Sequence, residues 1–223
     1  MKIRCSQLGK IMTNPTKKEM DQGEVLSKGA KTYLRQIAKE RFFEYTSEID
    51  SKYIDKGNAC EQECIDLYNA VNFTDYKKNT ERKSNDFLTG ECDIDTDGLV
   101  LDAKTSWSLE TFPATPEEAK SKSNASLYEW QGRGYMMLYN RPKFELFYGM
   151  VSTPIEQLKD WDNHSIHLVD HIAPEHRLTI LKYKRDKSIE EDIELKCRNA
   201  IEFIKEVIYE ITDKNSFTFK QIK

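Results

Sequence analysis

The sequence predicts a single α/β domain over residues 1–223, in which a central mixed sheet is flanked by helices. Two observations support this fold class. Segments whose apolar residues have helical spacing stand before, between and after segments in which apolar and polar residues alternate. In addition, no Pro/Gly/Ser-rich linker or internal repeat divides the chain, which is long enough to bury one core.

Four segments are expected to be helical. Residues 27–44 carry apolar side chains on one helical face, and residues 52–71 do the same. A loop over 108–125 is expected to lead into a third helix over 126–139. A long helix over 188–212 is expected to close the domain before a short polar tail.

Four segments are expected to be strands. Residues 87–95 and 99–107 alternate in polarity and are separated by Thr96-Asp97-Gly98, and Asp-Gly in such a position is typical of a hairpin turn. Residues 143–153 alternate in the same way, and residues 177–185 are expected to form the last strand. The predicted order is therefore helix, helix, hairpin, helix, strand, strand, helix.

The charge balance excludes one class of nucleic-acid-binding protein. The formal net charge is −4, so the chain is not expected to coat DNA or RNA through a globally positive surface. An enzyme with a locally positive groove remains compatible with this value. The basic side chains at 77, 78, 82 and 83 could form such a patch, or they could belong to a solvated loop.

The chain is expected to remain in the cytoplasm. No window approaches 18 consecutive apolar residues, and the first residues contain no apolar segment of a secretory signal. The five cysteines are scattered without a CxxC pair, so neither a zinc ribbon nor a disulfide framework is expected. Cys60 and Cys64, at helical spacing, are interpreted as buried thiols, with a metal or redox role as the alternative.

The predicted hairpin carries an unusual set of charges. If Asp97-Gly98 is a two-residue turn, Asp93 lies opposite Asp102 on one face, and Lys104 projects to the same face. Like charges directly opposite each other destabilise a sheet, and a divalent cation such as Mg²⁺ or Mn²⁺ would offset that cost. Lys104 could then orient a water nucleophile or stabilise charge on a phosphate. The alternative is that both acids face solvent, and a one-residue slip in register would move Asp93 to the other face.

Glu61 adds to this pattern. On a helical wheel for the predicted second helix it falls inside the apolar stripe. A carboxylate on a buried helix face needs a partner, which a metal site or a basic neighbour would supply. A glutamate at the helix edge that reaches solvent is the alternative.

Four short motifs occur in a fixed order along the chain. They are a glycine four residues before a helical glutamate, GxxD, DxK and QxxxY, carried by Gly57 and Glu61, Gly90 and Asp93, Asp102 and Lys104, and Gln131 and Tyr135. Together with the opening IRCSQLGKIM, they resemble the lambda-exonuclease-like, YqaJ-type viral recombinases of the PD-(D/E)XK nuclease superfamily. The resemblance extends from Ser6 to about residue 210.

The resemblance implies a restriction-endonuclease-like core and a set of site residues. Mg²⁺, with Mn²⁺ as a substitute, would be held by Asp93, Asp102 and the backbone carbonyl of Ala103, while Glu61 supports the site and Lys104 acts on the attacking water. Gln131 would contact the DNA end or the active-site water, with Tyr135 one turn further along the same face, and Ser6 would lie near the terminal phosphate. No iron–sulfur cluster is expected, because Cys197 is the sole cysteine near the end of the sequence.

The resemblance also implies an activity and partners. Family members digest duplex DNA from the 5′ end, work with a single-strand-annealing protein, and in the best-known cases form a trimeric ring. Two departures from the motif are Asp102 in place of the usual glutamate and Cys92 in place of a proline.

Several alternatives remain open. An endonuclease on the same core, or a DNA-binding protein with a decayed nuclease core, would share these motifs. Gln131 and Tyr135 could belong to an ordinary core helix, and Ser6 could be a helix N-cap. The histidines between His164 and His176 lack ligand spacing and are expected to be surface or structural residues.

Overall fold

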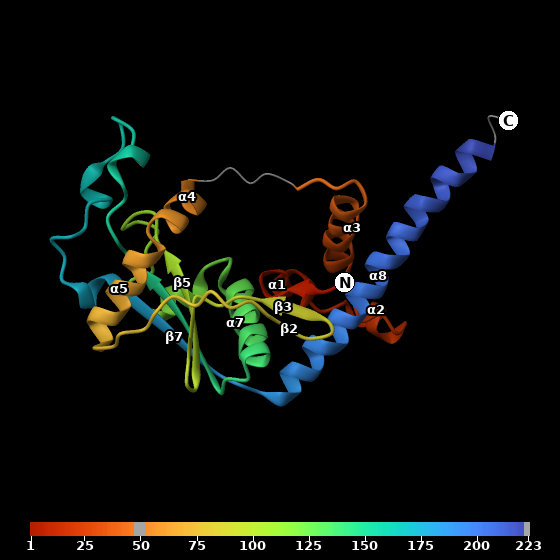
Figure 1. Ribbon diagram of the computed structural model, residues 1–223, viewed down its shortest axis with the longest axis horizontal. Helices are drawn as coiled ribbons and strands as arrows, with labels where there is room; N and C mark the ends of the chain where they lie inside the picture. Colours follow the sequence, from red (N-terminus) through yellow and green to blue (C-terminus); the bar gives the residue numbers. More distant parts are fainter. Residues whose placement is uncertain (47–51, 221–223) are drawn as a thin grey trace.

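The computed structural model describes residues 1–46 and 52–220 (Figure 1). The helices are α1 Leu8–Ile11, α2 Lys17–Asp21, α3 Lys28–Phe42, α4 Lys52–Ala59, α5 Glu61–Asn72, α6 Pro116–Ser121, α7 Ala125–Tyr139 and α8 Lys187–Lys220. The strands are β1 Ile3–Arg4, β2 Lys83–Ser84, β3 Leu88–Gly90, β4 Ile94–Thr96, β5 Leu99–Thr105, β6 Lys143–Gly149 and β7 Leu178–Lys184. This mixed α/β architecture agrees with the predicted fold class.

The main sheet has the strand order β4-β5-β6-β7. Strands β5 and β6 are parallel, and the chain between them passes through α6 and α7, whereas the other two pairs are antiparallel. Helix α7 packs on one face of β5 and β6, and α5 packs on the other face. The side chains of β5 therefore alternate between these two helices, which determines which of them can meet a residue of α7.

The hairpin register agrees with the prediction. Thr96 pairs with Leu99, Asp95 with Val100, and Ile94 with Leu101. The turn places Gly98 at φ +110°, a conformation that favours glycine.

The prediction of one strand over 87–95 is wrong. Strand β3 belongs to a separate three-stranded sheet with β1 and β2, and the chain leaves it before β4 begins. The main-chain carbonyl of Asp93 accepts a hydrogen bond from the Asn79 N–H (2.7 Å) instead of pairing with β5. Asp93 therefore stands just beyond the end of the β4–β5 ladder and is not a ladder partner of Asp102.

The prediction of one helix over 52–71 is also wrong, because the chain breaks into α4 and α5 at Cys60 (φ −108°, ψ 11°). The fully buried Lys56 ammonium donates hydrogen bonds to the main-chain carbonyls of Trp107 (3.1 Å) and Val151 (2.8 Å). These bonds hold α4 beside the residues that follow β5 and β6. Helical hydrogen bonds still run through the break, from the Cys60 N–H to the Lys56 carbonyl and from the Cys64 N–H to the Cys60 carbonyl.

Other predicted boundaries also differ from the structure, and the strand predicted over 143–153 ends at Gly149. The loop over 108–125 contains the short helix α6, which Thr115 caps by accepting a hydrogen bond from the Glu118 N–H. Helix α8 begins at Lys187 and runs to Lys220, past the predicted end at 212. Figure 1 shows α8 alongside α3 and then extending beyond the rest of the fold.

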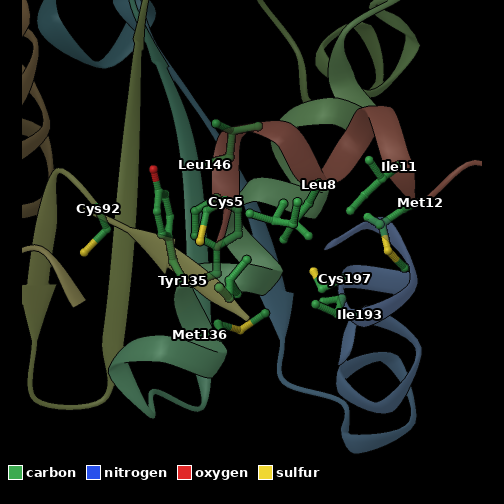
Figure 2. Packing of buried hydrophobic residues seen from close by; sticks show 14 of the residues in the cluster. Cys5, Leu8, Ile11, Met12, Cys92, Tyr135, Met136, Leu146, Ile193 and Cys197 are labelled. Carbon is green, nitrogen blue, oxygen red and sulfur yellow. The ribbon is translucent and has the colours of Figure 1, made fainter. Parts of the chain in front are cut away.

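The largest core cluster lies between α7, α1, α3 and α8. In Figure 2, Cys5 and Leu8 lie beside Tyr135 of α7, and Cys197 of α8 lies near Met12. All five cysteines are buried and free, in agreement with the interpretation as core thiols. No described helix has the length and apolar character that a membrane span requires.

Candidate active site

A cavity of about 630 Å³ opens where α4, α5 and α7 meet strand β5. Seven of the eight residues selected from the sequence line it, and they are Glu61, Asp93, Asp102, Ala103, Lys104, Gln131 and Tyr135. The strand β5 supplies three of them in succession, while α7 supplies Gln131 and Tyr135 one turn apart. Elements distant in sequence thus bring the DxK and QxxxY motifs to one place.

The two aspartates are held in different ways. Asp93 Oδ2 accepts a hydrogen bond from the Ala103 N–H (2.6 Å), so its carboxylate occupies the position next to β5 that a ladder partner would take. Asp102 is buried, with 1% of its surface exposed. Its Oδ1 accepts a hydrogen bond from Gln131 Nε2 (3.3 Å), and its Oδ2 lies 2.5 Å from Lys104 Nζ.

The electrostatics of the site show the cost of this arrangement. Burial and then the nearby charge of Asp102 raise the pKa of Asp93 well above its ordinary range, to about 7. Burial alone would lower the pKa of Lys104, but Asp102 and Asp93 together raise it above its ordinary value. Lys104 is therefore a cation at neutral pH, and the two carboxylates repel each other.

Gln131 and Tyr135 form a short hydrogen-bonded pair beside Asp102. Gln131 Nε2 donates to the Tyr135 hydroxyl (2.7 Å) as well as to Asp102. Tyr135 is buried at 4% exposure, so its hydroxyl fixes the orientation of the Gln131 amide. Gln131 thus faces the cavity, while Gly132 and Tyr135 on the same helix pack in the core. Helix α7 therefore carries core residues and a polar site residue together.

Glu61 is less buried than the helical wheel suggested. It is the first residue of α5, its side chain is 26% exposed, and it forms an ion pair with Lys78. The partner that a carboxylate requires there is thus a basic neighbour in this structure. Among the described residues, no group of three or more His, Cys, Asp and Glu side chains is arranged to hold a metal ion, so Glu61 does not converge with the two aspartates.

Ser6 is placed differently from the other selected residues. It lies in a short 3₁₀ turn over Cys5–Gln7, is exposed, and is not among the residues that line the cavity. The alternative, that Ser6 is a helix N-cap, does not hold, because Arg4 is the N-cap of that turn and Gln7 is the N-cap of α1.

The basic residues between 77 and 83 do not form a continuous positive patch. Each of them lies next to a carboxylate: Lys77 next to Asp75, Lys78 next to Glu61, Arg82 next to Glu91, and Lys83 next to Glu81 and Asp95. The predicted alternative, a solvated loop with paired charges, describes this segment better.

The sequence analysis selected Tyr135 but not the other four aromatic residues of the cavity, which are Tyr53, Trp107, Tyr128 and Tyr148. Tyr148 lies on the same face of β6 as Phe144 and Leu146 and has the pattern of an ordinary core residue of a strand. The signal that distinguishes it is its pairing with Lys104 across the parallel strands, and this pairing depends on a register that local sequence does not specify.

The donor atoms of the cavity fit a hard divalent cation. Asp102 Oδ2 is buried and accepts no hydrogen bond of suitable geometry, although it lies near the Lys104 ammonium. Carboxylate and carbonyl oxygens are the ligands that Mg²⁺ and Mn²⁺ prefer. Residues able to hold such an ion are Asp93, Asp102 and the carbonyl of Ala103, with Glu61 at the edge of the same cavity.

Comparison with known proteins gives a relative of similar length. No family model and no curated protein matches the sequence. Among solved structures, a phage-related exonuclease from Haemophilus somnus 129PT is 31% identical, with a TM-score of 0.88, over 95% of this chain and 96% of that chain.

More distant structures share the fold. An alkaline exonuclease, LHK-Exo from Laribacter hongkongensis, is 13% identical with a TM-score of 0.66, over 97% of this chain and 94% of that chain. The same protein in complex with dAMP gives a TM-score of 0.64 at 13% identity, with the same coverage. The 31% identity over nearly the full length of both chains, and the ordered motifs that meet in one cavity, identify the family. The chain belongs to the phage-related exonucleases of the lambda-exonuclease-like, YqaJ-type group.

Proposed function

We propose that this nuclease is a magnesium-dependent DNA exonuclease of the PD-(D/E)XK class that hydrolyses phosphodiester bonds at the ends of duplex DNA. The observation that carries the proposal is the meeting of Asp93, Asp102 and Lys104 in one cavity, where Asp102 is buried and its Oδ2 lies 2.5 Å from Lys104 Nζ. The similarity to a phage-related exonuclease supports a nuclease. Digestion from the 5′ end, with Mn²⁺ as a substitute for Mg²⁺, is part of the proposal.

The charged residues of the cavity have different roles in the proposed reaction. Asp93, Asp102 and the Ala103 carbonyl would hold Mg²⁺, which when bound supplies Lewis acidity and lowers the pKa of a bound water. Lys104 orients the attacking water and stabilises charge that develops on the phosphate. Glu61 supports the site once it is released from Lys78.

Gln131 and Ser6 are assigned to the DNA end. Gln131 contacts the end or the attacking water, and the buried Tyr135 hydroxyl holds its amide in position. Ser6 is exposed outside the cavity, so its proposed contact is with the terminal phosphate of a bound DNA end.

The proposal extends to the setting of the reaction. The enzyme acts in the cytoplasm of a bacterial host in phage-type recombination, and it hands the remaining strand to a single-strand-annealing protein. A trimeric ring around the duplex is the proposed assembly.

The test compares linear with covalently closed circular duplex DNA in the presence of Mg²⁺, using the wild type and Lys104→Ala. We expect the wild type to degrade the linear DNA and leave the circle intact, and we expect the variant to cleave neither. Nicking of the circle would favour an endonuclease on the same core. Full activity of Lys104→Ala would refute the assignment of the site, and inactivity of the wild type on both substrates would favour a DNA-binding protein.

A further inference from the structure

A buried tyrosine beside Lys104 lacks a hydrogen-bond partner. Tyr148 lies on β6 directly across from Lys104 of β5 in the parallel register, so both side chains project to the sheet face that α7 covers. Tyr148 is 3% exposed and lines the cavity. Its hydroxyl is buried and makes no hydrogen bond within the described residues.

Such a hydroxyl is unusual, because buried polar groups are nearly always paired. Phenylalanine would fill the same space without this cost. Four buried side-chain atoms of the described chain lack a hydrogen-bond partner, and two of these, the Tyr148 hydroxyl and Asp102 Oδ2, belong to residues that line this cavity. Lys104, whose ammonium lies 2.5 Å from Asp102 Oδ2, stands beside both residues.

A cation held by Asp102 would weaken the ion pair between Asp102 and the Lys104 ammonium, because the two positive charges repel each other. The other neighbours of the ammonium are Asp93, which the same cation would engage, and the tyrosines Tyr128 and Tyr148. The ring of Tyr128 lies 4.8 Å away, and the hydroxyl of Tyr128 already accepts a hydrogen bond from Asn124 Nδ2 (3.0 Å). The Tyr148 hydroxyl, in contrast, makes no hydrogen bond within the described residues, so its oxygen can accept one from the ammonium.

We infer that Tyr148 is a positioning residue for Lys104: its hydroxyl oxygen accepts a hydrogen bond from the ammonium when Asp102 is engaged by the cation. The ammonium then stays in the cavity, pointing at the attacking water, and the Tyr128 ring supports it from another side. This inference rests on the proposed function, since it requires a cation at Asp93 and Asp102.

The first test measures Mg²⁺ binding without DNA, by calorimetry on the full-length protein. Tyr148→Phe should weaken Mg²⁺ binding about tenfold, because the displaced ammonium loses its second acceptor. In a Lys104→Met background no ammonium has to be moved, so adding Tyr148→Phe should leave the Mg²⁺ affinity unchanged. Equal affinity of wild type and Tyr148→Phe, or the same loss in both backgrounds, would overturn the inference.

The second test uses kinetics on linear duplex DNA with saturating Mg²⁺. Tyr148→Phe should lower kcat about tenfold and leave KM nearly unchanged, because the hydroxyl acts on Lys104 and not on DNA binding. The matched control is Tyr183→Phe, at a tyrosine on the neighbouring strand β7 whose ring stacks on Phe144 (5.6 Å) and does not line the cavity. The control should match the wild type in both kinetic constants, and unaltered kcat in Tyr148→Phe would contradict the inference.

The stability of the variant distinguishes a positioning role from a structural one. Urea unfolding should show that Tyr148→Phe is at least as stable as the wild type, since an unpaired hydroxyl is removed. A marked loss of stability would instead indicate a structural role and overturn the positioning role. If the wild type binds Mg²⁺ and digests DNA but Tyr148→Phe does so equally well, the inference alone fails. If the wild type does neither, the proposed function fails.

Discussion

Two carboxylates that repel each other dominate the energetics of the site at the scale of single residues. The pKa of Asp93 is raised to about 7, mainly by burial and then by the charge of Asp102. In the unfolded chain the same carboxyl titrates near pH 4, so between these values the folded state binds more protons than the unfolded state. Asp93 therefore lowers the stability of the metal-free protein progressively from about pH 4 to pH 7, and above pH 7 the full cost is present.

Asp93→Asn should remove that cost. The amide oxygen can still accept the hydrogen bond from the Ala103 N–H, while the negative charge beside Asp102 disappears. At pH 8 and without metal, we expect the free energy of unfolding to rise by on the order of 1–3 kcal/mol, and at pH 4 we expect almost no change. Urea unfolding at the two pH values measures this difference.

The same variant should lose its response to Mg²⁺. The wild type should gain melting temperature with added Mg²⁺ at pH 8, because the ion binds the folded state. Asp93→Asn should gain little, since a ligand charge is missing. A variant that is less stable than the wild type at pH 8, or that responds equally to Mg²⁺, would contradict the role of Asp93 as a strained metal ligand.

The fit of helix α7 against the sheet is the constraint that matters most at the scale of elements. A Cβ built on Gly132 would lie 1.9 Å from the ring of Phe144 on β6, a distance that no relaxed contact allows. Gly132→Ala should therefore lower the free energy of unfolding by about 1–3 kcal/mol, even though alanine favours a helix. Urea unfolding followed by circular dichroism measures the change.

A second glycine provides the control. A Cβ on Gly57 of α4 would meet no atom within 4 Å, so Gly57→Ala should be neutral or stabilise by about 0.5–1 kcal/mol. If the two alanine variants shift stability in the same direction, the close packing of α7 on β6 is not the reason for glycine at position 132.

At the scale of elements, the sequence predicted features that depend on local residues and missed features that depend on distant contacts. The alternation along 99–105 and the Asp-Gly turn correctly predicted the hairpin register, because both are local properties. The burial of Lys56 beside the break at Cys60 was not predictable, because its ammonium is bonded to residues 51 and 95 positions further along the chain. The pairing of Glu61 with Lys78 has the same origin, since the position of α5 determines which basic side chain it meets.

In the candidate site too, residues placed by local structure were predicted, whereas residues placed by long-range contacts were not. Asp102 and Lys104 were recognisable because a strand places residues two apart on one face. Tyr148 was not, since its proximity to Lys104 follows from the parallel β5–β6 register that a crossover through α6 and α7 creates. The hairpin pattern correctly placed Asp93 close to β5. Asp93 contacts β5 through its carboxylate, however, because it lies outside the paired residues of β4 and β5.

Charge is the feature that bears on DNA binding at the scale of the whole molecule. The net charge is −4, and the basic residues between 77 and 83 each lie beside a carboxylate. The net charge and this paired segment do not provide a globally positive surface that would retain duplex DNA between cleavage events. We propose that a closed ring around the duplex retains the DNA instead.

Retention of the DNA by a closed ring predicts that processive digestion depends only weakly on salt concentration. At constant Mg²⁺, the logarithm of the number of nucleotides removed per binding event should fall with a slope of about −1 or less against the logarithm of KCl concentration, because few phosphate contacts are broken at each step. Sedimentation under the same conditions should give three times the 26.1 kDa mass of one chain. A steep slope of about −4 or more together with a monomeric mass would show that charge retains the DNA, and the trimeric ring would then be the wrong assembly.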